Sequence, residues 1–159
     1  MNDSNDLAAL DALLDAGASH DRLLDWVLER TSTPSGSIHV MGADGKLHLA
    51  AQRGLPDEML GVIKCIPVGK GMAGLAAERR EPVSLCNLQT DTSGDARPGA
   101  KVTGLRGTVA VPMLRAERDV AGVLGVGRPE EHTFEGAELD FLRRAADRIA
   151  RSMPLPADP

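Results

Sequence analysis

The chain has 159 residues, a hydrophobic share of 42% and a formal net charge of −5 at pH 7. This length and composition fit one folded domain and exclude a largely disordered chain. Aromatic residues make up only 2%, and the sequence shows no basic patch, so we expect neither nucleic acid nor an anionic membrane surface as a partner.

No stretch approaches the roughly 20 apolar residues that a membrane helix needs. The first residues are acidic and lack the cationic start of a secretory signal. The two cysteines, Cys65 and Cys86, fit neither a zinc spacing nor a disulfide framework. A cytoplasmic protein with reduced thiols is therefore expected.

The first elements along the chain are helical. Leucines at three-and-four spacing predict a helix over residues 4–16, which ends at Gly17. A second helix begins at Ser19 or Asp21 and ends near Thr31, before a proline and a glycine.

A β-hairpin follows, with Asp44–Gly45 as its tight turn. Pairing Ala43 with Lys46 gives a register in which apolar and polar residues alternate on both strands. His39 and His48 then share the polar face as an exposed pair, and without a third ligand we expect no metal site. In this register Val40 opposes Leu49 and Ile38 opposes Ala51, Leu47 joins their apolar face, and Met41 joins the histidines.

The remaining elements surround a glycine-rich turn and a long loop. Gly69 and Gly71 suit turn conformations, and Gly74 suits close packing or, with the turn, an anion at the following helix N-terminus. The elements predicted in order are a helical turn at 56–62, a helix ending near Arg80, strands at 83–86, 108–114 and 120–127, and a helix from a Thr133 cap to about Met153.

The loop at residues 87–106 is the segment that most suggests a binding site. A loop this long inside a compact domain is usually functional or mobile. Its hydroxyls and cations suit a polar or anionic ligand, although a solvated loop with Arg97 paired to Asp91 or Asp95 is the alternative. The predicted ligand-binding residues are Asp91, Thr92, Ser93, Arg97 and Lys101 in the loop, with Gly71 and Met72 in the glycine-rich turn.

The helices at the two ends carry matching apolar seams. Such seams pair in helical bundles, either within one chain or between two. We predict a homodimer through them. The predicted dimer residues are Leu7, Leu10 and Leu14 near the start of the chain, and Leu139, Leu142 and Ile149 near its end.

Several segments, taken together in their order and spacing, resemble the GAF domain family of small-molecule sensors over about residues 20–152. The resemblance implies an α+β fold with an antiparallel sheet of five or six strands, terminal helices on one face, and pocket-covering loops and short helices on the other. The expected layout is an N-terminal helix at 1–18, the GAF domain at 19–153 and a Pro-rich tail at 154–159. The segments that carry the resemblance are Ile66–Gly74, Glu81–Leu85, Gly107–Met113, Val120–Val126 and Phe134.

The function that this resemblance implies is non-catalytic signalling. A small molecule is expected to order loop 87–106, to bias the packing of the terminal helices and to signal through a separate partner protein. No cofactor, metal or catalytic residue is expected. A protein-interaction adaptor with an empty pocket is an open alternative.

An enzyme is the other alternative, because free methionine-R-sulfoxide reductases share the GAF fold and use cysteine thiols. In that family a cysteine follows the Gly-x-Gly turn, where this chain has Ala73, and the nucleophile lies in the long loop, where residues 87–106 contain no cysteine. The glycine-rich turn also matches a dinucleotide fingerprint, but no βαβ unit accompanies it. We therefore expect no catalysis.

Overall fold

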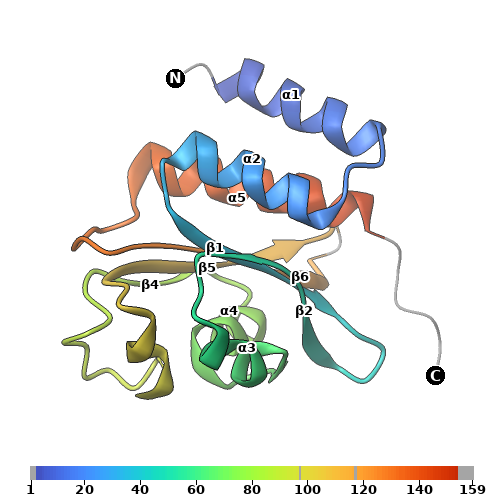
Figure 1. Ribbon diagram of the computed structural model, residues 1–159. Helices are drawn as coiled ribbons and strands as arrows, with labels where there is room; N and C mark the ends of the chain where they lie inside the picture. The colour runs from blue at the N-terminus through green and yellow to red at the C-terminus, as the bar shows by residue number, and fades with distance from the viewer. Residues whose placement is uncertain (1–2, 97, 117, 154–159) are drawn as a thin grey trace.

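A six-stranded antiparallel sheet separates two layers of helices (Figure 1). In this computed structural model, residues 3–96, 98–116 and 118–153 are described. Helices α1, α2 and α5 cover one face of the sheet, and α3, α4 and a 3₁₀ segment, η1, lie on the other. The elements are α1 (Asp3–Asp15), α2 (His20–Thr31), β1 (Ser35–Met41), β2 (Lys46–Arg53), α3 (Asp57–Ile63), β3 (Cys65–Pro67), α4 (Gly71–Arg79), β4 (Val83–Leu85), η1 (Pro98–Thr103), β5 (Gly107–Leu114), β6 (Val120–Arg128) and α5 (Gly136–Ser152), and the strand order is β3-β2-β1-β6-β5-β4.

The architecture confirms the predicted α+β fold, and most helix boundaries follow from local signals. The Ser19 hydroxyl caps α2 by accepting a hydrogen bond from the Arg22 backbone N–H at 3.2 Å. The predicted Thr133 cap of the last helix is wrong: α5 begins at Gly136, with Glu135 as its N-cap residue. None of the helices in the described part of the chain is long and apolar enough to cross a membrane.

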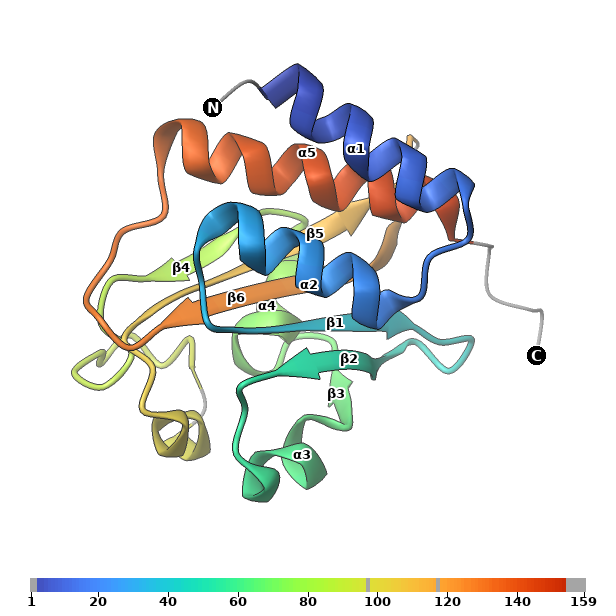
Figure 2. The same cartoon turned by 45° about the horizontal axis from the view of Figure 1, so that its top comes forward.

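The matching seams of the terminal helices meet within a single chain. Helix α1 lies along α5 (Figure 2), and Arg148 forms an ion pair with Asp11 at 3.0 Å. This packing buries the apolar seams within one chain. The homodimer remains a prediction, because the burial of these residues does not depend on a second copy. Of the six seam residues, Leu7, Leu10, Leu142 and Ile149 are buried in the main core, and Leu14 and Leu139 are partly buried against it.

The hairpin register departs from the predicted one at a β-bulge. Ile38 opposes Ala51 as predicted, but the register shifts between Ile38 and His39, so Val40 opposes His48 instead of Leu49. A bulge adds one residue to one strand, which sends every later side chain to the other face. Leu47 therefore packs in the smaller core on the α4 side, and His39 and His48 lie on opposite faces of the sheet.

Both faces of the central strands are covered, as predicted. Strand β5 is buried along nearly its whole length. The short strand β3 and the segment η1 were not among the predicted elements, because three-residue strands and 3₁₀ turns carry almost no periodic signal. These two short elements help to enclose a space above the sheet.

Candidate functional site

A cavity of about 180 Å³ lies between the sheet and the layer formed by α3, α4 and η1. An engineered apolar cavity of about 150 Å³ binds benzene, so this space is large enough for a small organic molecule. Its lining comprises Ser35, Gly36, Ser37, His39, Leu55, Met59, Val62, Ile63, Ile66, Lys70, Gly71, Met72, Ala73, Leu88, Ala96, Ala100, Thr103, Leu105, Thr108, Val109, Ala110, Gly125, Val126 and Gly127.

Small residues on the central strands create the floor of this cavity. Ser37 of β1 and Ala110 of β5 flank Gly125 of β6, with which both are in register. A Cβ atom added at Gly125 would lie 3.2 Å from the Ser37 Oγ, a tight contact. Small side chains at these three positions therefore leave room between the sheet and the helices that cover this face.

His39 is the most buried polar side chain of the lining, with an exposed fraction of 2%. Its Nε2 atom lies 2.8 Å from the carbonyl oxygen of Ile63, the last residue of α3. Burial lowers the pKa of His39, the Ile63 carbonyl opposes this effect, and His48 adds a smaller lowering. Because a carbonyl oxygen only accepts, Nε2 carries the proton, and Nδ1 is a buried acceptor without a partner among the described residues.

The glycine-rich turn places the N-terminus of α4 against the cavity. Gly69 and Gly71 have φ angles of +92° and +67°, which glycine adopts readily, so the predicted turn role is confirmed. A Cβ atom at Gly74 would lie 2.5 Å from the Pro67 carbonyl oxygen, which confirms the predicted close packing. The N-cap residue of α4 is Lys70, and its side chain makes no capping hydrogen bond. The first backbone N–H groups of α4 therefore remain available near the cavity.

The predicted binding residues divide into two groups. Gly71 and Met72 line the cavity, and the Thr108 hydroxyl donates to the Met72 Sδ at 3.4 Å. Asp91, Thr92, Ser93 and Lys101 are not part of the lining, and Arg97 lies outside the described residues.

Contacts within the loop account for the polar residues that the cavity does not use. The Asp91 carboxylate accepts hydrogen bonds from the Ser93 backbone N–H at 3.2 Å and from its hydroxyl at 2.6 Å. Thr92 and Lys101 are exposed. The loop instead contributes apolar and small residues, of which the two leucines could have been singled out by hydrophobicity: Leu88, Ala96, Ala100, Thr103 and Leu105.

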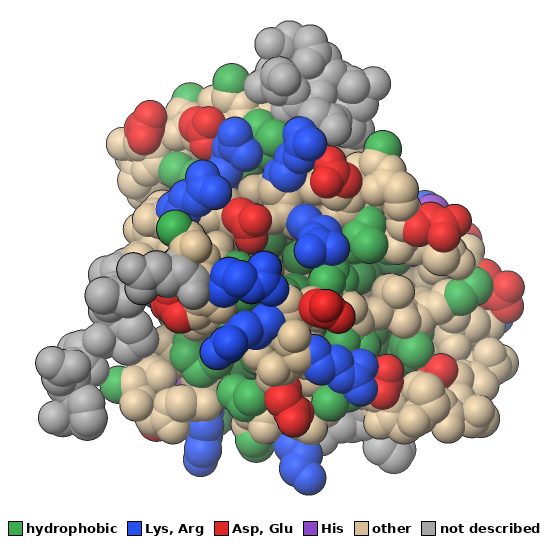
Figure 3. Space-filling view, turned by 180° about the vertical axis from the view of Figure 1, so that it is seen from behind, with side chains coloured by type: hydrophobic (Ala, Val, Ile, Leu, Met, Phe, Trp, Pro, Cys, Tyr) green, Lys and Arg blue, Asp and Glu red, His purple; other side chains and the backbone are tan. Residues whose placement is uncertain are grey.

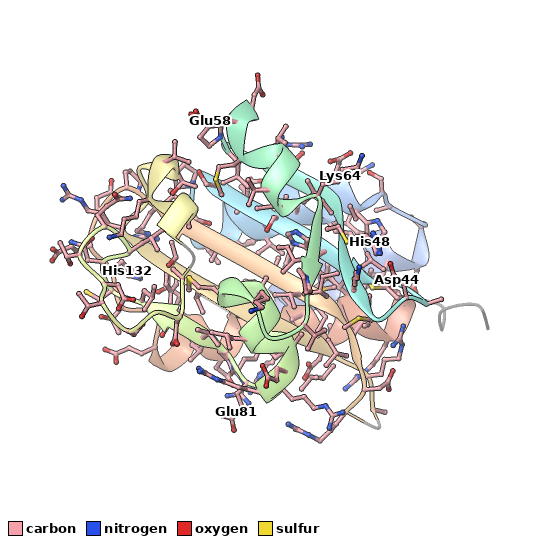
Figure 4. All side chains as sticks on the ribbon, turned by 90° about the horizontal axis from the view of Figure 1, so that it is seen from below. Asp44, His48, Glu58, Lys64, Glu81 and His132 are labelled. Carbon is pink, nitrogen blue, oxygen red and sulfur yellow. The ribbon has the colours of Figure 1, made fainter. Side chains whose placement is uncertain are left out.

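The two cysteines and His48 lie outside the cavity lining. Cys65 and Cys86 are both exposed, and neither lines the cavity. His48 lies beside Asp44 at the end of the hairpin, with 2.9 Å between its Nε2 and the Asp44 Oδ2 (Figure 4). No group of three His, Cys, Asp or Glu side chains among the described residues is placed to hold a metal ion.

The architecture is thus an antiparallel sheet with a cavity between one of its faces and a layer of short helices. The family model described as the GAF domain matches residues 20–153, so the chain belongs to the GAF domain family. Domains of this family commonly bind small molecules. No curated protein matches the chain in sequence.

Solved structures share this fold at low sequence identity. The GAF domain of a phosphoenolpyruvate-protein phosphotransferase from Acinetobacter has a TM-score of 0.78 at 20% identity, covering 96% of this chain and 92% of that one. The corresponding domain from Coxiella burnetii has a TM-score of 0.75 at 22% identity, with 96% and 94% covered. The reduced form of fRMsr from Staphylococcus aureus has a TM-score of 0.67 at 16% identity, with 96% and 95% covered.

Proposed function

We propose that this chain is a non-catalytic sensor module that binds one small molecule in the cavity between the sheet and the α3–α4 layer. The observation that carries the proposal is the cavity itself. Its volume of about 180 Å³ suits a ligand somewhat larger than benzene. The bound molecule changes the position of the cavity walls, and a separate partner protein reads that change.

The lining favours a largely apolar ligand with one polar or anionic end. Met59, Ile66 and Leu105 represent the apolar majority of the side chains. No carboxylate belongs to the described lining, whereas Lys70 and the uncapped start of α4 lie together at one side. A cation and free backbone N–H groups both favour negative charge, so the anionic end of the ligand faces this side.

Helix α3 is the wall of the cavity that responds to the bound ligand. Helix α3 has only seven residues and no side-chain cap, and its contact with the sheet includes the His39–Ile63 hydrogen bond. Short helices depend on tertiary packing for their stability. A ligand that packs against Met59 stabilises α3 in its closed position, which converts binding into a change at the surface.

The positions of the cysteines support a non-catalytic role. A reductase of free methionine sulfoxide needs a thiolate that can reach the substrate. Neither Cys65 nor Cys86 lines the cavity, and Ala73 occupies the wall at the start of α4. A ligand held in the cavity therefore has no thiol within the lining to attack it.

Native mass spectrometry of the purified protein tests the proposal. We expect a fraction of the protein to carry one small molecule that is released on denaturation. Ala73→Leu, which fills the cavity from the α4 wall, should abolish this added mass, and Ala8→Leu on exposed α1 should retain it. A wild-type protein that stays free of any ligand across cell extracts and compound libraries would favour an adaptor with an empty cavity.

A further inference from the structure

A second, smaller pocket lies at the uncovered edge of β5, and it shares no lining residue with the ligand cavity. Strand β4 pairs only with Thr108–Ala110, so in the described part of the chain the edge from Val111 to Leu114 has no neighbouring strand. Helix α5 and the end of α4 border this edge. The pocket measures about 60 Å³ and is lined by Arg80, Pro82, Val111, Pro112, Leu114, Arg118, Arg143 and Asp147.

Three separate elements each contribute one arginine to the pocket. Arg80 caps the C-terminus of α4, Arg118 lies in the β5–β6 turn and Arg143 lies on α5. All three are exposed, and within the described residues none forms an ion pair with a carboxylate. Among the described residues, the one hydrogen bond made by their side chains runs from the Arg118 Nη2 to the Arg80 carbonyl oxygen, at 3.4 Å. Their guanidinium N–H groups therefore remain available to a ligand.

Two of these arginines occupy backbone conformations that glycine adopts more easily. Arg80 has a φ of +57° and Arg118 a φ of +66°, and Ser32 is the one other non-glycine residue with a positive φ in the described chain. Glycine is the usual residue both after a helix C-terminus and at such a hairpin position. Two strained arginines at one pocket indicate that their side chains serve a purpose there.

The charge of the pocket contrasts with that of the whole chain. Asp147 is the one carboxylate of the described lining, so three positive charges face one negative charge and two positive charges remain. The chain itself has a net charge of −5. Figure 3 shows several Lys and Arg side chains on the back of the molecule, with Asp and Glu side chains among them. A local excess of cations on an acidic protein attracts anions to this place.

We propose that this pocket binds a phosphate group in its doubly charged form. Two uncompensated positive charges match a phosphate monoester better than a singly charged carboxylate. Guanidinium groups bind phosphate oxygens through paired N–H donors, which three arginines converging from different elements can supply. A volume of about 60 Å³, a third of that of the larger cavity, suits a single terminal group. The rest of the phosphorylated compound projects from the surface.

Calorimetric titration of the purified chain with inorganic phosphate, at constant ionic strength set by chloride, tests the site. Arg143→Gln should weaken phosphate binding at least tenfold. Arg144→Gln is the matched control, because Arg144 is the next residue of α5, pairs with Asp140 at 3.0 Å and does not line the pocket. Its affinity should equal that of the wild type. An absence of phosphate binding by the wild type, or an equal loss in both variants, would overturn the proposal.

Arg118→Gly separates a binding role from a structural one. Glycine relaxes the backbone at a φ of +66°, so the melting temperature should stay the same or rise while phosphate binding falls at least tenfold. Unchanged phosphate binding in this variant would contradict the site. Ala73→Leu should leave phosphate binding intact, because the two pockets share no lining residue. The phosphate proposal can therefore hold even if the larger cavity binds no ligand.

The source of the phosphate is distinguished by comparing inorganic phosphate with a short phosphoserine peptide. Much tighter binding of the peptide assigns the site to a phosphorylated partner protein, and equal binding assigns it to small phosphorylated compounds. Both results require the phosphate group. A peptide with aspartate in place of phosphoserine that binds equally tightly would contradict the proposal and favour an acidic protein segment instead.

Discussion

The Nε2 of His39 lies 2.8 Å from the carbonyl oxygen of Ile63, and this contact joins the floor of the cavity to the end of its α3 wall. His39 is 2% exposed, and its other ring nitrogen is buried without a partner among the described residues. Protonation of the ring would therefore place an unpaired charge inside the domain. Burial without a partner for Nδ1 therefore favours the neutral ring, which lowers the pKa of His39.

Stability should fall at acidic pH through His39. Burial lowers the pKa of His39 in the folded protein below the value of 6.5 of the unfolded chain. As the pH falls below about 6.5, the unfolded chain takes up this proton first, so the contribution of His39 is fully present above that pH and is lost below it.

Urea unfolding at pH 7 and pH 5 measures this effect. The free energy of unfolding should fall more between the two pH values in the wild type than in His39→Gln, which keeps a donor but does not titrate. His20→Gln, at a histidine outside the cavity lining, should behave as the wild type. An equal pH dependence in wild type and His39→Gln would show that His39 does not titrate in this way.

The intramolecular packing of α1 leads to a second prediction. Leu10 has no exposed surface within one chain, so Leu10→Ala should lower the free energy of unfolding by about 2–5 kcal/mol. If α1 packs on its own chain, this loss is independent of protein concentration; a seam between two chains would make it vary with concentration. Chemical unfolding at two protein concentrations that differ 100-fold, together with sedimentation of the wild type, decides between packing within one chain and packing between two chains.

The sequence was sufficient for the order of the elements and the family, because helix periodicity and the spacing of the glycine-rich turn are local signals. It was insufficient for the hairpin faces, because an alternating pattern does not show that Ala50 is inserted between the paired residues Leu49 and Ala51. Polar residues of loop 87–106 were predicted to bind, whereas Leu88 and Leu105 form its cavity wall.

The arginine-lined pocket could not be predicted from the sequence either. Arg80, Arg118 and Arg143 are far apart along the chain and form no basic run. They meet only because α4, the β5–β6 turn and α5 surround the same open strand edge. Such a site depends on tertiary structure, and no local pattern predicts it.

The third prediction concerns the thiols. Cys65→Ser combined with Cys86→Ser should change the free energy of unfolding by no more than about 0.5 kcal/mol, because both cysteines are exposed. The ligand-bound fraction should also stay the same, because neither cysteine lines the cavity. An assay for thiol-dependent reduction of free methionine sulfoxide should detect no activity in the wild type. Activity that disappears in the double variant would establish an enzyme.

The most direct measurement of the central claim is an NMR titration of the isotope-labelled protein with benzene. The cavity of about 180 Å³ exceeds the ~150 Å³ cavity that binds benzene, so we predict saturable amide shifts at residues such as Ser37, Ala110 and Met72. Ala73→Leu should reduce the affinity at least tenfold, and Ala8→Leu should not change it. An absence of saturable shifts in the wild type, or identical shifts in Ala73→Leu, would contradict a ligand-binding cavity at this place.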